Sequence, residues 1–219
     1  MTDRAHPLPI LYSFRRCPYA MRARMALRAS ETQCELREVL LANKPEAMIE
    51  ASPKATVPVL HLTDGDVIDE SLAVMNWALA QNDPQSWIAH PGDDADALIE
   101  TNDGPFKHHL DRYKYHSRYG EDCDPIEHRT AAAEILRGLE ARLSQHAYLC
   151  GDKQSRADIA IFPFIRQFGA TDRDWFDAQD WPHLRKWLDR HIASDLFKAI
   201  MAKRDPWQPG DPVTLFLDR

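Results

Sequence analysis

A single cysteine followed by a proline is the part of the sequence best suited to chemistry. Cys17-Pro18 stands where a short apolar, β-prone run, residues 9–14, gives way to a helical pattern. Proline is favoured at the first position of a helix because its missing N–H would lack a partner there. The sequence therefore predicts that Cys17 lies at a helix N-terminus, where exposed N–H groups and the positive end of the dipole favour a thiolate.

Positive charge surrounds this cysteine. Four arginines lie within residues 15–24: Arg15, Arg16, Arg22 and Arg24. Lowering the pKa of a cysteine from about 8.5 to about 6 requires about 3.4 kcal/mol, whereas a helix terminus contributes about 2 kcal/mol at most. Direct N–H···S hydrogen bonds or a nearby arginine must supply the rest. The alternative interpretation is that Cys17 is a small, buried apolar residue.

Composition limits the classes of function. The 219 residues are 44% hydrophobic and 28% charged, as in an ordinary globular protein of one large or two modest domains. A net charge of −7, with no basic run, argues against nucleic acid as a partner. With no apolar stretch of signal-peptide or membrane-span length, we expect a cytoplasmic protein without membrane association. Reduced cysteines are expected, and structural roles for three of them: Cys34, Cys123 and Cys150.

The first half of the chain alternates strand and helix signals. The predicted order is a strand at 9–14, a helix after Pro18, a strand at 34–40, a short helix starting at 43–46, a strand at 57–62, a turn at 64–66, a strand at 67–68 and a helix from 69 or 70 to about 80. Pro58 cannot donate to a β-ladder, so it belongs at a strand start, edge or bulge, and its peptide bond can be trans or cis.

Strand signals end at a predicted domain boundary near residues 82–92. Beyond it, periodicity predicts helices at 93–117, 126–146, 155–169 and 181–200, followed by a proline-containing tail from Pro206. Ser155 and Asp158 have capping-box spacing at the start of the third of these helices.

Five short motifs, in this order and spacing, resemble the cytosolic glutathione transferases, in particular an omega-like, cysteine-type bacterial member. They are Cys-Pro-Tyr-Ala from Cys17, Asn-Lys-Pro-Glu from Asn43, Val-Pro-Val-Leu from Val57, Asp-Glu-Ser-Leu from Asp69 and Ser-Arg-Ala-Asp from Ser155. The resemblance implies an α/β thioredoxin-like, glutathione-binding domain over residues 1–82. An all-helical C-terminal domain over residues 83–219 follows, with a substrate pocket between the two.

The same resemblance assigns a glutathione site. Val57, ahead of a cis Pro58, would pair its backbone with the cysteinyl part of glutathione in strand-like fashion. Glu70 and Ser71 would hold the γ-glutamyl ammonium and carboxylate; the alternative is that they only cap a helix. Lys44 and Tyr19 match glutathione-contacting positions of the family, with a solvated lysine and a core tyrosine as the alternatives.

The absence of a second thiol decides the expected chemistry. Thioredoxins carry another cysteine three positions after the first, and this sequence has Ala20 there. Cys17 would therefore form a mixed disulfide with glutathione, which a second glutathione thiol resolves. We expect a glutathione-dependent thiol transferase or reductase acting on glutathionylated thiols, dehydroascorbate or small disulfides. The alternatives are a conjugating glutathione S-transferase and a non-catalytic, stress-related, glutathione-binding regulatory protein.

Further candidates lie in the helical half. An aromatic and basic cluster could line the substrate pocket or serve as core and solvated surface: Tyr113, Lys114, Tyr115 and Tyr119. His108-His109 has no third ligand partner in the sequence pattern, so no metal is expected. Glutathione is the expected co-substrate, and the family resemblance favours a homodimer.

Overall fold

The computed structural model describes residues 7–88 and 94–217, and the chain forms two compact units. Residues 1–85 together with 195–219 make the first, and residues 86–194 make the second. The sequence placed 195–219 in the helical domain, whereas α10 (Asp195–Ile200) packs on α1 of the first unit. Part of the expected boundary at 82–92, and the first residue of the helix expected at 93–117, lie outside the described residues.

The first unit is built on a four-stranded mixed sheet in the order β2-β1-β3-β4. β1 (Ile10–Ser13) is parallel to β2 (Glu35–Glu38) and antiparallel to β3 (Val59–His61), which pairs with β4 (Val67–Ile68). β1 is buried along its whole length, as its three consecutive apolar residues, Ile10, Leu11 and Tyr12, favour. Gly65, at φ +97°, makes the turn between β3 and β4, a conformation that glycine adopts without steric cost.

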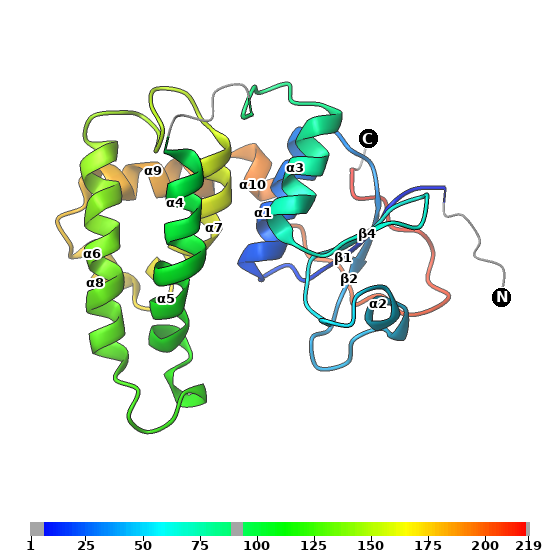
Figure 1. The fold of residues 1–219 in the computed structure, drawn as a ribbon, viewed down its shortest axis with the longest axis horizontal. Helices are drawn as coiled ribbons and strands as arrows, with labels where there is room; N and C mark the ends of the chain where they lie inside the picture. The colour runs from blue at the N-terminus through cyan, green and yellow to red at the C-terminus, as the bar shows by residue number, and fades with distance from the viewer. Residues whose placement is uncertain (1–6, 89–93, 218–219) are drawn as a thin grey trace. The chain divides into compact units, whose positions relative to one another are not determined.

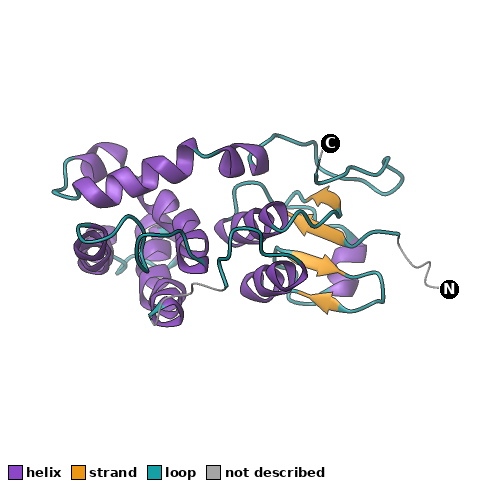
Figure 2. Cartoon of the chain, turned by 90° about the horizontal axis from the view of Figure 1, so that it is seen from above, coloured by secondary structure: helices purple, strands orange, loops and turns teal. Residues whose placement is uncertain are grey.

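Three helices cover the two faces of this sheet. α1 (Pro18–Ala29) and α3 (Ser71–Gln81) lie side by side on one face of the sheet, and α2 (Glu46–Ala51) covers the other (Figure 2). The resulting order, β-α-β-α-β-β-α, confirms the predicted thioredoxin-like fold.

The C-terminal segment is more than a tail, because it pairs with the edge strand β2. The amide of Leu36 donates to the carbonyl of Thr214 (2.8 Å), and the amide of Phe216 donates to that of Cys34 (2.9 Å). Trp207 covers Arg37, whose guanidinium carbon lies 4.2 Å from the centre of the indole ring. This cover explains how β2, with the sequence Glu-Leu-Arg-Glu, is buried throughout.

The second unit is all helical (Figure 1). Its elements are α4 (Ala95–Thr101), a π-helical stretch (Asn102–Phe106), α5 (Lys107–Lys114), a short 3-10 turn (His116–Arg118), α6 (Pro125–Leu143), α7 (Arg156–Gly169), α8 (Arg173–Asp177) and α9 (Pro182–Ala193). The π stretch contains Pro105, whose missing N–H accounts for the local change in hydrogen bonding. Periodicity did not predict α8, which is only five residues long.

Asp158 organises the interior of this unit. The predicted capping box is present: the amide and hydroxyl of Ser155 both donate to Asp158 Oδ2 at 2.9 Å. The other oxygen, Oδ1, accepts from the amide of Leu149 (3.0 Å) and from Trp187 Nε1 (2.8 Å). Four donors on one buried carboxylate tie α7 to α9 and to the preceding loop.

Candidate glutathione site

Cys17 occupies the predicted position at the N-terminus of α1. It is the N-cap residue, with extended backbone and Pro18 as the first helical residue. Its amide donates to the carbonyl of Phe14 (3.0 Å), and its own carbonyl accepts from the amide of Met21 (2.9 Å), which closes the first turn. The side chain is half-buried, so the alternative of a fully buried apolar cysteine does not apply.

The backbone of Val57 lies beside this sulfur. Cys17 Sγ lies 3.7 Å from the carbonyl oxygen of Val57, and the Val57–Pro58 peptide bond is cis. Val57 belongs to a buried apolar cluster that includes Tyr12 and Ala20, and Cys17 packs against this cluster. The structure thus brings together two residues 40 positions apart, and it decides between the two isomers that the sequence left open.

Among the arginines, Arg24 is coupled electrostatically to Cys17. Its side chain is buried, and Nη2 donates to the carbonyl of Arg15 (2.6 Å). Burial lowers the pKa of Arg24 to about 10, while the negative charges of Glu38 and of a Cys17 thiolate oppose this shift. Glu38 forms an ion pair with the same guanidinium, with 3.9 Å between Arg24 Nη1 and Glu38 Oε2. The buried guanidinium of Arg24 would therefore stabilise a negative charge on Cys17, although Glu38 partly neutralises it.

Arg22 links the second turn of α1 to the first turn of α3. This buried guanidinium donates from Nη1 to the hydroxyl of Ser71 (3.2 Å) and lies 5.7 Å from the centre of the Tyr19 ring. Ser71 is the first residue of α3 and is itself buried. Two of the predicted glutathione ligands, Tyr19 and Ser71, are thus held by one arginine. The N-terminus of α3 and this guanidinium both favour an anion beside Ser71.

Glu70 has a partner that the sequence did not indicate. Lys54 Nζ lies 2.6 Å from Glu70 Oε1 and 3.1 Å from Asp69 Oδ1. Hydrogen bonds to Glu70 and Asp69 raise the pKa of Lys54, and the Ser52 hydroxyl at 2.7 Å is the main cause of the lowered pKa of Asp69. An incoming ammonium would share Glu70 with Lys54. Lys54 and Glu70 are 16 positions apart, so no local sequence pattern marks Lys54 as the partner.

Lys44 is not tied to the rest of the group. It lies half-buried in the loop before α2. Within residues 7–88 and 94–217, no hydrogen bond or ion pair joins it to the other predicted ligands, so its role stays a prediction.

The other cysteines differ from Cys17 in their surroundings. Cys34 is fully buried before β2, and burial raises the pKa of its thiol far above the ordinary value. Burial also raises the pKa of Cys150. Cys123 lies with its sulfur 3.8 Å from the carbonyl of Arg112. All four cysteines are free thiols in the structure.

The predicted aromatic cluster of the second unit divides into separate environments. Tyr113 belongs to the core, with its ring centre 5.3 Å from that of Phe168. Tyr115 lies under Arg118, 4.4 Å from its guanidinium carbon, whereas Tyr119 is exposed and pairs with Arg112. These positions agree with the alternative of core and solvated surface, and a role of the cluster in lining a substrate pocket stays a prediction.

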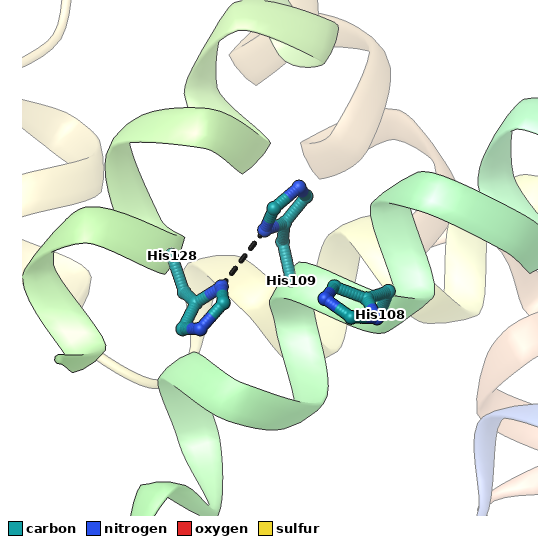
Figure 3. Close-up of side chains that lie close together, drawn as sticks. All are labelled: His108, His109 and His128. Carbon is teal, nitrogen blue, oxygen red and sulfur yellow. Dashed lines mark hydrogen bonds between the residues drawn. The ribbon is translucent and has the colours of Figure 1, made fainter. Parts of the chain in front are cut away.

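The expectation that His108-His109 has no third ligand partner is wrong. His128, on α6, lies beside them, and His109 Nδ1 and His128 Nδ1 are 2.9 Å apart (Figure 3). The pattern failed here because the third imidazole lies 19 positions away on another helix.

Over the part of the chain that the structure describes, no helix is both long and apolar enough to cross a bilayer.

The fold and this arrangement define a class: a thioredoxin-like unit, with a cysteine at the start of its first helix and a cis-proline before its third strand, followed by a helical unit. Residues 11–87 match the glutathione S-transferase N-terminal domain, and residues 108–195 match the glutathione S-transferase C-terminal domain. The chain belongs to the glutathione S-transferase family.

Relatives agree with this assignment. The chain is 40% identical to glutathione S-transferase omega-1 of Mus musculus over 180 residues, which cover 81% of this chain and 74% of that protein. It is 26% identical to glutathione S-transferase U28 of Arabidopsis thaliana over 210 residues, 90% and 89% of the two chains. Its fold also matches a glutathione S-transferase-I structure bound with lactoylglutathione, with a TM-score of 0.72 and 21% identity over 89% of this chain and 98% of that one.

Proposed function

We propose that this glutathione transferase works as an omega-like thiol transferase with Cys17 as its nucleophile. The observation that carries the proposal is the half-buried Cys17 sulfur at the N-terminus of α1, 3.7 Å from the carbonyl of Val57 before a cis-proline. A free tripeptide thiol that pairs its backbone with Val57 would place its sulfur beside Cys17. When that sulfur arrives in a mixed disulfide, the Cys17 thiolate can attack it, form the Cys17–glutathione disulfide and release the other thiolate.

The reaction proceeds in two thiol–disulfide exchanges. The Cys17 thiolate attacks the glutathione sulfur of a glutathionylated substrate, forms the Cys17–glutathione disulfide and releases the substrate thiolate, which takes up a proton. A second glutathione thiolate then attacks this disulfide, releases glutathione disulfide and restores the Cys17 thiolate. No internal disulfide competes, because the position three residues on is the buried Ala20.

The remaining residues have binding roles in this proposal. Ser71, the N-terminus of α3 and Arg22 favour the γ-glutamyl carboxylate, while Glu70 accepts the ammonium. Tyr19 and Lys44 contact the tripeptide. Small disulfides are reduced by the same two steps. Dehydroascorbate requires a different first step: the Cys17 thiolate adds to one of its carbonyl carbons, a glutathione thiolate attacks the Cys17 sulfur, and ascorbate leaves with the bonding electron pair and takes up protons. The resulting Cys17–glutathione disulfide is then resolved by a second glutathione as above. We also propose a homodimer, which light scattering tests.

Intact mass after incubation with glutathione disulfide tests the nucleophile. We expect the mass of one added glutathionyl group, mapped to Cys17 and absent from Cys17→Ser. Cys123→Ser is the matched control, since Cys123 is also a half-buried thiol, and it should keep the adduct. An adduct on another cysteine, or none, contradicts the proposal.

Two alternatives give different results. If Cys17→Ser loses thiol transfer and gains conjugation of glutathione to an electrophile, the thiolate is the nucleophile of the wild type; unchanged activity would exclude that role. Glutathione binding with no turnover of any disulfide would support the regulatory alternative. The rate of Cys17 alkylation, measured as a function of pH, tests the thiolate directly. A midpoint near the free-cysteine pKa of about 8.5 would remove the case for an activated thiolate.

A further inference from the structure

Three imidazoles from two helices of the second unit form a compact group, here called the histidine triad: His108 and His109 on α5, and His128 on α6 (Figure 3). One nitrogen from each ring lies within 4.8 Å of the others. The ring centres are 5.0 Å apart for His108 and His109, 5.8 Å for His108 and His128, and 5.2 Å for His109 and His128. The sequence pattern of the family motifs does not account for this triad.

We propose that the histidine triad binds one late first-row divalent metal ion, with Zn²⁺ as the representative case. Three imidazole nitrogens suit such ions, whereas Mg²⁺ and Ca²⁺ prefer sets of oxygen ligands. His108 is exposed and the other two rings are half-buried, so the fourth coordination position faces water.

The geometry needs only side-chain adjustment. Ligand nitrogens about 2.0–2.1 Å from a tetrahedral ion lie about 3.3 Å from one another. His109 Nδ1 and His128 Nδ1, at 2.9 Å, would move slightly apart, and the widest separation of 4.8 Å would shorten. One of these two nitrogens carries the hydrogen that they share. A metal would take the place of that hydrogen, and the donating ring would shift its single proton from Nδ1 to Nε2 and stay neutral.

Burial, followed by nearby positive groups, acts on the two rings of α5, His108 and His109. Burial, Arg112 and the neighbouring histidines lower the pKa of His108, and burial with the same groups lowers that of His109. Asp111 and Glu127 act in the opposite direction on His108 and His109 respectively.

Arg112 is the competitor built into the site. Its Nη1 donates to His108 Nδ1 (3.0 Å), so that lone pair must be released before a metal can use it. The released guanidinium keeps two contacts, with the carbonyl of His108 (3.4 Å) and with the ring of Tyr119 (4.4 Å). Releasing His108 therefore does not leave the Arg112 charge without a partner.

Co²⁺ titration of the full chain, purified without a histidine tag, tests this proposal. We expect one equivalent to bind with visible d–d absorption and without the near-ultraviolet charge-transfer band of a thiolate ligand. His108→Gln should weaken binding at least about tenfold and leave the fold intact because this ring is exposed; His128→Gln should abolish it. His116→Gln, an exposed histidine outside the triad, is the matched control and should bind as the wild type does.

The Arg112→Gln variant is the most informative one, because it should change the affinity in the opposite direction. It removes a positive charge and the hydrogen bond that occupies His108 Nδ1, so we expect binding to tighten about tenfold. Circular dichroism of each variant separates a lost site from a lost fold. No Co²⁺ binding by the folded wild type, a thiolate charge-transfer band, or binding unchanged in His108→Gln and His128→Gln would each overturn the proposal.

Discussion

Acid should destabilise the helical unit through one histidine. His191 on α9 is 2% exposed and packs against two aromatic rings, with centres 5.0 Å away for Phe162 and 4.8 Å away for Trp187. Burial is the main cause that lowers its pKa from 6.5 to about 3, and Arg190 adds to it. No described group pairs with Nε2, and Gln154 Nε2 lies 3.4 Å from Nδ1 and donates to it. The neutral ring therefore carries its hydrogen on Nε2, and a second proton would go to Nδ1, where it would face the Gln154 donor.

The sign and size follow from linkage. Between pH 6.5 and about 3 the unfolded chain binds a proton at this ring and the folded chain does not, so stability falls as the pH decreases through this window. At pH 5 this proton binding raises the equilibrium constant of unfolding about 30-fold, which lowers the free energy of unfolding by about 2 kcal/mol. Nearly all of this loss is absent at pH 7.5.

Urea unfolding of the wild type and of His191→Phe between pH 7.5 and pH 5 measures this effect. Phenylalanine suits the aromatic surroundings and cannot bind a proton, so the variant should lose about 2 kcal/mol less than the wild type over this range. The exposed His116→Gln is expected to keep the wild-type dependence. Equal pH dependence in the wild type and His191→Phe would refute the reasoning, because the ring would then not titrate differently on unfolding.

Two further changes test the packing of each unit. Asp158→Ala leaves four buried donors without an acceptor, including the Ser155 amide and Trp187 Nε1. At about 1–3 kcal/mol each, a loss of at least about 4 kcal/mol is expected in denaturant unfolding; a loss under about 1 kcal/mol would contradict the hydrogen-bond network. Trp207→Ala removes the cover of Arg37 and should cost about 2 kcal/mol, whereas Trp207→Phe keeps most of the stacking. Equal thermal midpoints for the two Trp207 variants would show that the ring contributes nothing.

How much of the fold could be predicted depended on how local its signals are. Pro18 after Cys17 and the Ser155–Asp158 capping box act within one helical turn, so the residue types themselves indicate where α1 and α7 begin. The five-residue α8 was missed because it is too short to show a period. The pairing of the C-terminal segment with β2 was missed because extended pairing at an edge leaves no pattern in a proline-containing segment.

The candidate site divides in the same way. Its residue types were visible, since Cys17, Val57 and Ser71 stand in recognisable motifs. Their partners were not: Arg22 reaches Ser71 across 49 positions, and Lys54 reaches Glu70 across 16. Such contacts depend on how two packed helices, or a loop and a helix, are positioned against each other. A single sequence does not specify that position.

The amino-acid sequence by itself determined the β-α-β-α-β-β-α order of the first unit and the position of the thiol at a helix start, because propensity, capping and periodicity operate over a few neighbouring residues. Only the tertiary structure decided that the Val57–Pro58 bond is cis, that its carbonyl faces the Cys17 sulfur, and that His128 completes a group with His108 and His109. Those features depend on the packing of segments far apart in the chain, where the free energy of the whole unit, and not the preference of any one segment, selects the conformation.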